Sequence, residues 1–151
     1  MSNVRQHKNP PHSSKKNQPL STHQPSAATS VIVYAKSMAS VSRFYQDTLE
    51  LEVIEVEPTY ILLSRNGVEV VVVQAPNAVV EHIAFSSPRE LREATPVKAS
   101  FLVQDFGQVR AAAERNGGTL KPEEAAWEWR GAVHLDGSDP EGNVVQFRKN
   151  V

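Results

Sequence analysis

The feature that most constrains the fold of this chain is an order of predicted elements that occurs twice. A strand, a helix and three further strands are predicted over residues 30–75, and the same order is predicted again over residues 97–149. One such unit leaves a face of its sheet uncovered, so its repetition predicts two modules packed together. We expect an α+β fold in which two βαβββ modules form a cup-shaped mixed β-sheet with the helices on the outside.

The first module is indicated by hydrophobic periodicity and turn residues. The run VIVYAKS after Ser30 is typical of a buried strand, and Ser37 can cap the helix that follows. LEVIEVE, TYILLSR and VEVVVVQA then predict strands, with a tight hairpin at Asn66-Gly67 between the last two. The helix is expected to bury one apolar stripe, made of Met38, Val41, Phe44 or Tyr45, and Thr48 or Leu49.

The second module follows a proline-rich connector. VKASFLVQD predicts its first strand, Asp105 or Gln104 the cap of its helix, and Asn116-Gly117-Gly118 the end of that helix. Thr119-Leu120-Lys121 predicts a short strand, WEWRGAVHLD a single longer strand, and NVVQFRK the last strand, after the turn SDPEG. The helix is expected to bury Phe106, Val109, Ala112 and Ala113.

The first 29 residues differ in composition from the rest. They are rich in Pro, Ser, Asn, Gln and His and nearly lack large apolar side chains, so they cannot bury enough surface to offset the entropy of ordering. We expect a disordered basic N-terminal tail over residues 1–29 and one folded domain over residues 30–151. The tail contains serine and no acidic residue, which leaves a transit peptide open, although no amphipathic apolar face is present.

Composition also excludes several classes of protein. The absence of cysteine rules out disulfides, thiolate catalysis and cysteine-based zinc sites. Four of the 16 basic residues and none of the 17 acidic ones lie in the first 30 residues, so the remainder carries 12 basic against 17 acidic side chains. That acidic body argues against a nucleic-acid groove. With no apolar run long enough to span a membrane, we expect a cytoplasmic protein with no nucleic-acid and no membrane partner.

Two stretches resemble a known superfamily. VIVYAKSMASVSRFYQDTLELEV is similar to the opening of a module in the vicinal oxygen chelate superfamily, which includes glyoxalase I, bleomycin-resistance proteins and extradiol dioxygenases. The turn Asp139-Pro140-Glu141-Gly142-Asn143 before the last strand resembles the most recognisable ending of that family. The resemblance spans roughly residues 30–149 and implies a small-molecule pocket in the cup. It also implies a homodimer, because relatives often complete the cup with a partner chain.

In relatives that use a metal, a divalent ion lies in the cup and is held by the first and last strands of each module. By the resemblance, those four positions fall on Ser30, Lys98, Gln146 and either Val71 or Glu69. A hydroxyl, an ammonium and an amide are poor ligands for an ion that must act as a Lewis acid. We therefore predict no metal and no other cofactor.

The main alternative is a divalent-metal-dependent lyase or dioxygenase with an atypical ligand set. It would use Glu69, His82, His134 and Gln146, although nothing in their spacing brings them together. A third possibility, from another class, is a structural or regulatory module whose cup is filled by its own side chains.

The leading hypothesis is a glyoxalase/bleomycin-resistance-like protein that binds a small organic molecule in an apolar cup, as a sequestering or resistance-type protein. Trp127 and Trp129 stand two residues apart, so on a strand they share a face. They could line the cup, where aromatic walls suit flat or cationic ligands, or they could cover one end of the core. The residues expected to bind the ligand are Tyr34, Tyr60, Glu69, Phe101, Trp127, Trp129, His134 and Gln146.

Overall fold

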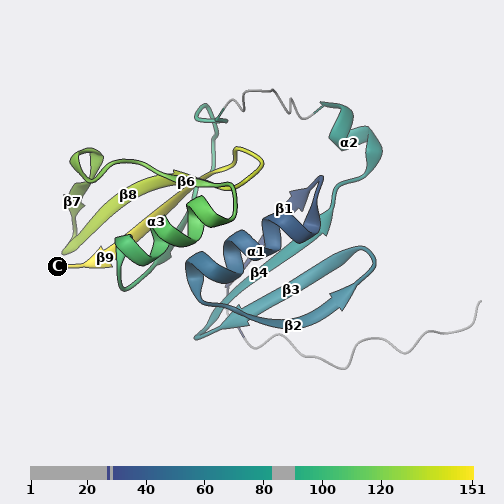
Figure 1. The fold of residues 1–151 in the computed structure, drawn as a ribbon, viewed down its shortest axis with the longest axis horizontal. Coiled ribbons are helices and arrows are strands. Elements are labelled where there is room, and N and C mark those ends of the chain that lie inside the picture. The colour runs from purple at the N-terminus through teal and green to yellow at the C-terminus, as the bar shows by residue number, and fades with distance from the viewer. Residues whose placement is uncertain (1–26, 28, 83–90) are drawn as a thin grey trace, which may run out of the picture.

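The computed structural model describes residues 27, 29–82 and 91–151 (Figure 1). The predicted disordered tail lies outside the described residues, apart from residues 27 and 29. The first module comprises β1 (Thr29–Ala35), α1 (Met38–Leu49), β2 (Glu52–Glu57), β3 (Tyr60–Arg65) and β4 (Val68–Gln74). A short helix that was not predicted, α2 (Asn77–His82), follows in the connector. The second module comprises β5 (Ala99–Leu102), α3 (Phe106–Arg115), β6 (Thr119–Leu120), the 3-10 helix η1 (Glu123–Ala125), β7 (Trp127–Trp129), β8 (Ala132–Ser138) and β9 (Val144–Asn150).

The strands form two mixed sheets, which confirms the predicted α+β fold. The first sheet has the order β1-β4-β3-β2, and the second has the order β5-β9-β8-β6, with β7 also paired to β8. In each sheet the first strand of the module pairs in parallel with the last, and the other pairs are antiparallel. In Figure 1 the first sheet lies on the right and the second on the left.

Local signals set the first module as expected. The Ser37 hydroxyl accepts a hydrogen bond from the Ser40 backbone N–H at 3.4 Å and caps α1. Asn66 and Gly67 have φ of 54° and 78°, the positive values that a tight two-residue hairpin needs. Helix α1 buries Val41, Ser42, Phe44, Tyr45 and Thr48.

The second module departs from the prediction at WEWRGAVHLD, which is not one strand. Here β7 and β8 form a hairpin whose turn residues, Arg130 and Gly131, have φ of 50° and 73°. Positive φ at both turn positions matches the twist of paired strands, and an Arg-Gly pair gives a weaker signal than Asn-Gly. Strands β6 and β7 both pair with β8, so together they take the edge position that β2 alone takes in the first sheet.

Helix α3 begins and ends where the sequence predicts. The Asp105 carboxylate accepts from the Gln108 backbone N–H at 2.7 Å, and the helix ends at Asn116 with Gly117 at φ 76°. A Cβ on Gly118 would collide with the ring of Phe44 and with the backbone carbonyl of the strand alongside. Glycine at this position therefore lets the α3–β6 connection cross directly over the first module.

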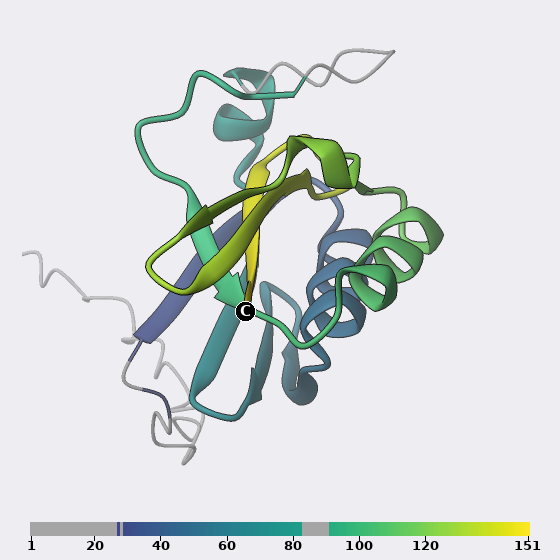
Figure 2. The same ribbon diagram turned by 90° about the vertical axis from the view of Figure 1, so that its left-hand side faces the viewer.

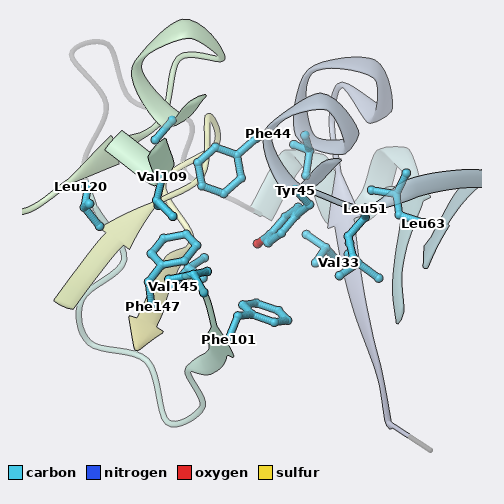
Figure 3. Packing of buried hydrophobic residues seen from close by; sticks show 14 of the residues in the cluster. Val33, Phe44, Tyr45, Leu51, Leu63, Phe101, Val109, Leu120, Val145 and Phe147 are labelled. Atoms are coloured by element: carbon cyan, nitrogen blue, oxygen red, sulfur yellow. The ribbon is translucent and has the colours of Figure 1, made fainter. Parts of the chain in front are cut away.

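One hydrophobic core serves both modules. Helices α1 and α3 lie side by side (Figures 1 and 2), and they pack against each other. Phe44 and Tyr45 project from α1 toward Val109 and Phe147 of the second module (Figure 3). The rings of Tyr45 and Phe101 meet edge to face, with centroids 6.2 Å apart. Because the core is shared, neither module is expected to be stable alone.

The turn between β8 and β9 holds a buried carboxylate. Asp139 has no exposed surface, and one of its oxygens accepts from the backbone N–H groups of Glu141 and Asn143, each at 2.9 Å. The other oxygen accepts from the Asn143 side-chain amide at 2.6 Å and from the Tyr45 hydroxyl at 3.4 Å. Burial raises the pKa of Asp139, although the hydrogen bonds from Asn143 and Glu141 oppose the shift. Burial, followed by the charge of Asp139, also raises the pKa of Tyr45.

The same turn reaches the start of α1. The Glu141 carboxylate accepts from the backbone N–H groups of Lys36 and Ser37, at 2.9 and 2.7 Å. A carboxylate here satisfies donors that a helix start leaves without internal partners and complements the helix dipole. We call residues 138–143 the joint turn, because Asp139 and Glu141 tie the second module to the first. Within residues 27, 29–82 and 91–151, no helix is long and apolar enough to cross a membrane.

Candidate functional site

Each sheet has one face against the helices and one open face, because side chains alternate along a strand. Val33, Val70 and Val72 mark the covered face of the first sheet, and Phe101, Leu135 and Phe147 mark that of the second. The open face of the first sheet carries Ser30, Ile32, Tyr34, Tyr60, Leu62, Ser64, Glu69, Val71 and Val73. The open face of the second sheet carries Ser100, Leu102, Trp127, Trp129, Ala132, His134, Asp136, Gln146 and Arg148.

The open face of the first sheet is apolar and edged with acids. Ile32 and Tyr34 are 60% and 53% exposed, whereas Glu69 is buried. Tyr34 and Tyr60 both lie beside Val73 in the register, on either side of β4. Partial desolvation, followed by the hydrogen bond and charge of Glu55 and the charge of Glu57, raises the pKa of the Tyr60 hydroxyl.

The open face of the second sheet is aromatic. His134 is buried between the two tryptophans: its ring stacks on Trp127 with centroids 5.6 Å apart, and the tilted Trp129 ring lies 5.9 Å away. The His134 Nδ1 lies 3.1 Å from the Gln146 side-chain oxygen, and its Nε2 lies 3.2 Å from the Trp129 backbone carbonyl oxygen. Both neighbours are acceptors, so an imidazole with one N–H donates to one of them, and this bond together with stacking on Trp127 restricts the orientation of the ring.

Cationic side chains surround this aromatic cluster. Lys98 forms an ion pair with Asp136 at 2.9 Å, and its ammonium lies 5.7 Å from the centroid of the Trp127 ring. The Arg130 guanidinium lies 5.4 Å from the centroid of the Trp129 ring. Arg148 donates from Nη1 to the backbone carbonyl of Ser100 at 3.1 Å and to its hydroxyl at 3.2 Å.

The open face of the second sheet contains a hollow of about 440 Å³. We call it the tryptophan hollow. Its volume falls within the range of small-molecule sites, and its lining combines an aromatic ring with a few convergent polar groups. The residues that line it are Ser100, Trp129, Arg130, Ala132, His134, Gln146 and Arg148.

The architecture has clear counterparts among solved structures, although no protein-family model and no curated protein sequence matches the chain. A glyoxalase/bleomycin resistance protein from Albidiferax ferrireducens T118 is similar with a TM-score of 0.57 at 17% identity, covering 81% of this chain and 97% of that one. A glyoxalase/bleomycin resistance protein/dioxygenase family enzyme from Burkholderia phytofirmans PsJN gives 0.58 at 19% identity, covering 81% and 97%. This chain has the vicinal oxygen chelate fold.

A third structure with the vicinal oxygen chelate fold contains a ligand. The bleomycin-binding protein from bleomycin-producing Streptomyces verticillus, complexed with copper(II)-bleomycin, is similar with a TM-score of 0.51 at 17% identity. The similarity covers 79% of this chain and 92% of that one. At these identities the similarity shows the fold, and the function has to be argued from the site.

The strand register shows how the side chains that the resemblance assigned to metal-ligand positions are paired. Ser30 of β1 lies opposite Glu69 of β4, and Ser100 of β5 lies opposite Gln146 of β9. The register therefore selects Glu69 rather than Val71 in the first module. In the second module it places Ser100 beside Gln146, whereas Lys98 precedes β5 and is occupied by its ion pair.

This donor set does not fit a divalent metal. It consists of two hydroxyls, one amide and one carboxylate, Glu69. The Gln146 oxygen already accepts from the Ser100 hydroxyl at 2.8 Å and lies within hydrogen-bond distance of His134. In the part of the chain that the structure describes, no three His, Asp or Glu side chains are grouped as they would be around a metal ion.

The structure divides the predicted binding residues between the two sheets. Four of them come together on the second sheet: Trp127, Trp129, His134 and Gln146. Three lie on the open face of the first sheet: Tyr34, Tyr60 and Glu69. Phe101 points the other way, into the core, and is 6% exposed. Of the alternative metal set, His82 ends α2, Glu69 lies in the first sheet, and the other two lie in the second.

Sequence reasoning missed the small Ala132 and three polar residues of the tryptophan hollow: Ser100, Arg130 and Arg148. Alternation could have found two of them, because Arg148 follows Gln146 by two residues and Ser100 neighbours the core residue Phe101. Arg130 could not have been found while WEWRGAVHLD was interpreted as a single strand, because its place at the rim depends on the β7–β8 turn.

Proposed function

We propose that this chain binds a small organic molecule in the tryptophan hollow and does so without a catalytic metal. The observation that carries the proposal is the hollow itself. An exposed tryptophan, a buried histidine and an arginine whose hydrogen bonds within the described residues use Nη1 alone border about 440 Å³ of open space. Such a lining orients a ligand and leaves a surface for it to cover.

The shape of the site favours binding over a purely structural role. In a module whose cup was filled by its own side chains, the large residues on the open face of the second sheet would be buried against one another. Here Trp129 is instead 60% exposed at the rim. The bleomycin complex of the Streptomyces verticillus protein supports small-molecule binding as a use of this fold.

The proposal of a metal-free site is supported by the donor set. Only Glu69 among the four ligand positions is a strong ligand for a hard cation, and the Gln146 amide is already engaged by Ser100. Elemental analysis of the purified protein, together with thermal unfolding in the presence of Mn²⁺, Ni²⁺, Zn²⁺ or Fe²⁺, tests this. A stoichiometric metal, or a metal-dependent rise in Tm, would favour the metal-dependent lyase or dioxygenase instead.

Ligand binding can be tested through the tryptophans alone. The chain has two tryptophans, both on β7 beside the hollow, so intrinsic tryptophan fluorescence reports on this site. We expect a fragment library screened by fluorescence and by indole N–H signals in NMR spectra to give saturable shifts. A His134→Ala variant should lose them, because the imidazole lines the hollow and contacts both indole rings. A screen that leaves both indoles unchanged would contradict the proposal.

We also propose that the chain is a homodimer, as the resemblance implies. The first sheet offers an exposed apolar open face, and its edge strand β2 carries Glu52, Glu55 and Glu57 in register with that face. An exposed apolar sheet face of this kind is a surface that a second copy of the chain would cover. Light scattering should give twice the chain mass of 16.7 kDa. A monomer at micromolar concentration would contradict it.

A further inference from the structure

We infer that the ligand of the tryptophan hollow is a planar molecule carrying an anionic group. The anion would bind Arg148 and the planar part would cover Trp129. This assignment rests on the proposed binding function and adds the chemical class of the ligand, which no similarity to other proteins supplies.

Arg148 provides the anion site. Its Nη1 is fixed by the carbonyl and hydroxyl of Ser100, which orients the guanidinium along the sheet. No ion pair joins Arg148 to a carboxylate among residues 27, 29–82 and 91–151, and the hydrogen bonds of Arg148 there use Nη1 alone. The Nε–Nη2 edge is thus free for a ligand. A guanidinium edge binds a carboxylate through two parallel hydrogen bonds, which gives direction as well as affinity.

The charge balance of the hollow also favours an anion. Asp136 is the acidic side chain on this open face, and Lys98 neutralises it at 2.9 Å. Arg130 and Arg148 then leave an uncompensated charge of about +2 at the rim, although residues 31–151 as a whole carry 12 basic against 17 acidic groups. A positive hollow on an acidic body would concentrate small anions at this position.

The aromatic rings favour a planar ligand and disfavour a cationic one. The sequence alone did not decide between a flat ligand and a cationic one, because the face of a tryptophan ring attracts both. In the structure, the cations of this chain already lie over the rings, with Arg130 5.4 Å from Trp129 and Lys98 5.7 Å from Trp127. A cationic ligand would therefore meet like charge. The exposed part of Trp129 remains for a flat, uncharged ring system to stack on.

Three probes that share a flat naphthalene ring and differ in charge separate the contribution of the anionic group from that of the ring. Naphthalene-2-carboxylate, naphthalene-2-carboxamide and 2-naphthylmethylammonium would each be titrated by calorimetry, with the indole N–H signals of Trp127 and Trp129 as the readout of site. We expect the carboxylate to bind at least tenfold more tightly than the carboxamide, and the ammonium to bind most weakly. Cyclohexanecarboxylate, which has the charge without the flat ring, should bind at least tenfold more weakly than the naphthoate.

Variants then locate the anion. Arg148→Gln should reduce the preference for carboxylate over carboxamide to less than twofold, and Arg148→Lys should restore only part of it, because an ammonium lacks the forked edge. Arg43→Gln is the matched control, since it removes the same charge from an exposed position on α1, remote from the hollow in the fold. The control should keep the full preference.

The outcomes distinguish a wrong choice of ligand class from a failure of the proposed binding function. Equal binding of carboxylate and carboxamide, with both indoles shifted, would overturn the anion and leave ligand binding in place. If the preference survived in Arg148→Gln, the assignment of the anion to this guanidinium would be wrong. If none of the probes moved the indoles, the planar anion would be excluded, and the binding function would depend on the fragment screen alone.

Discussion

Two turns occupy the same position in the two modules, each leading into the last strand, yet they do different work. The turn at Asn66-Gly67 is local: a Cβ on Gly67 would meet nothing within 4 Å. The joint turn is buried and holds Asp139 without exposed surface, bonded to Tyr45 of the other module. Both turns reverse the chain between two antiparallel strands, but only the joint turn also stabilises the packing of one module on the other. A hairpin signal alone therefore does not tell whether a turn is local or structural for the whole domain.

The largest test of this comparison is Asp139→Ala. The substitution would leave two half-buried backbone N–H groups and the Asn143 amide without their acceptor and would remove a fully buried side chain, so we expect a loss of about 3 kcal/mol in the free energy of unfolding. Urea unfolding measures it. Asp105→Ala is the matched control, because it removes an aspartate that caps a helix within one module and should cost about 1 kcal/mol. Equal losses of unfolding free energy in the two variants would mean that Asp139 contributes no more to stability than an aspartate that caps a helix within one module.

The second test uses pH. Burial raises the folded-state pKa of Asp139 above its ordinary value of 3.8, so the folded state holds this proton to higher pH than the unfolded state does. The stabilising contribution is full below that ordinary value and is lost as pH rises through the folded pKa. The stability of the wild type minus that of Asp139→Asn should therefore fall as pH rises above 3.8, measured by urea unfolding. A difference that rises with pH would mean that the hydrogen bonds outweigh burial.

The smallest effect is expected at the local turn. Gly67→Ala places a side chain at φ +78°, a strain that costs about 1 kcal/mol, with no neighbouring atom to disturb. Asn66→Gly serves as its control, because glycine accepts the positive φ of that position and should change stability little. A loss at Gly67 as large as that at Asp139 would show that the first hairpin also supports the domain.

Much of the fold could be predicted from the sequence because its signals are local. The caps at Ser37 and Asp105, the glycine-containing stops and the Asn66-Gly67 hairpin each depend on side chains within a few residues, and all were confirmed. The β7–β8 hairpin was missed because the positive φ at Arg130 is imposed by pairing with β8 rather than favoured by arginine. The role of Asp139 beyond its own turn was missed because Tyr45 lies 94 residues away in sequence.

For the candidate site, the sequence could predict which side chains of one strand share a face, but not which strands come together. Spacing placed Trp127 and Trp129 on one face correctly, and both rings contact His134, although only Trp129 lines the hollow. The sequence placed Tyr34 and Tyr60 in the first module and the tryptophans in the second, but it could not show whether the two open faces would line one site, since that depends on how the modules are arranged. Phe101 was expected in the cup because it is aromatic, but the alternation of β5 turns it into the core and exposes Ser100 instead.

The parallel pairing of β1 with β4 and of β5 with β9 has a consequence for the rate at which the chain folds. Ser100 and Gln146 meet across 46 residues, whereas Glu141 meets Lys36 across 105, so the contact between the joint turn and α1 closes a longer loop, and we expect it to form after each sheet has closed. The joint is thus expected to form after the rate-limiting step. Stopped-flow measurements on Asp139→Ala should show faster unfolding with nearly unchanged refolding, which would make the joint a determinant of how long the native state lasts.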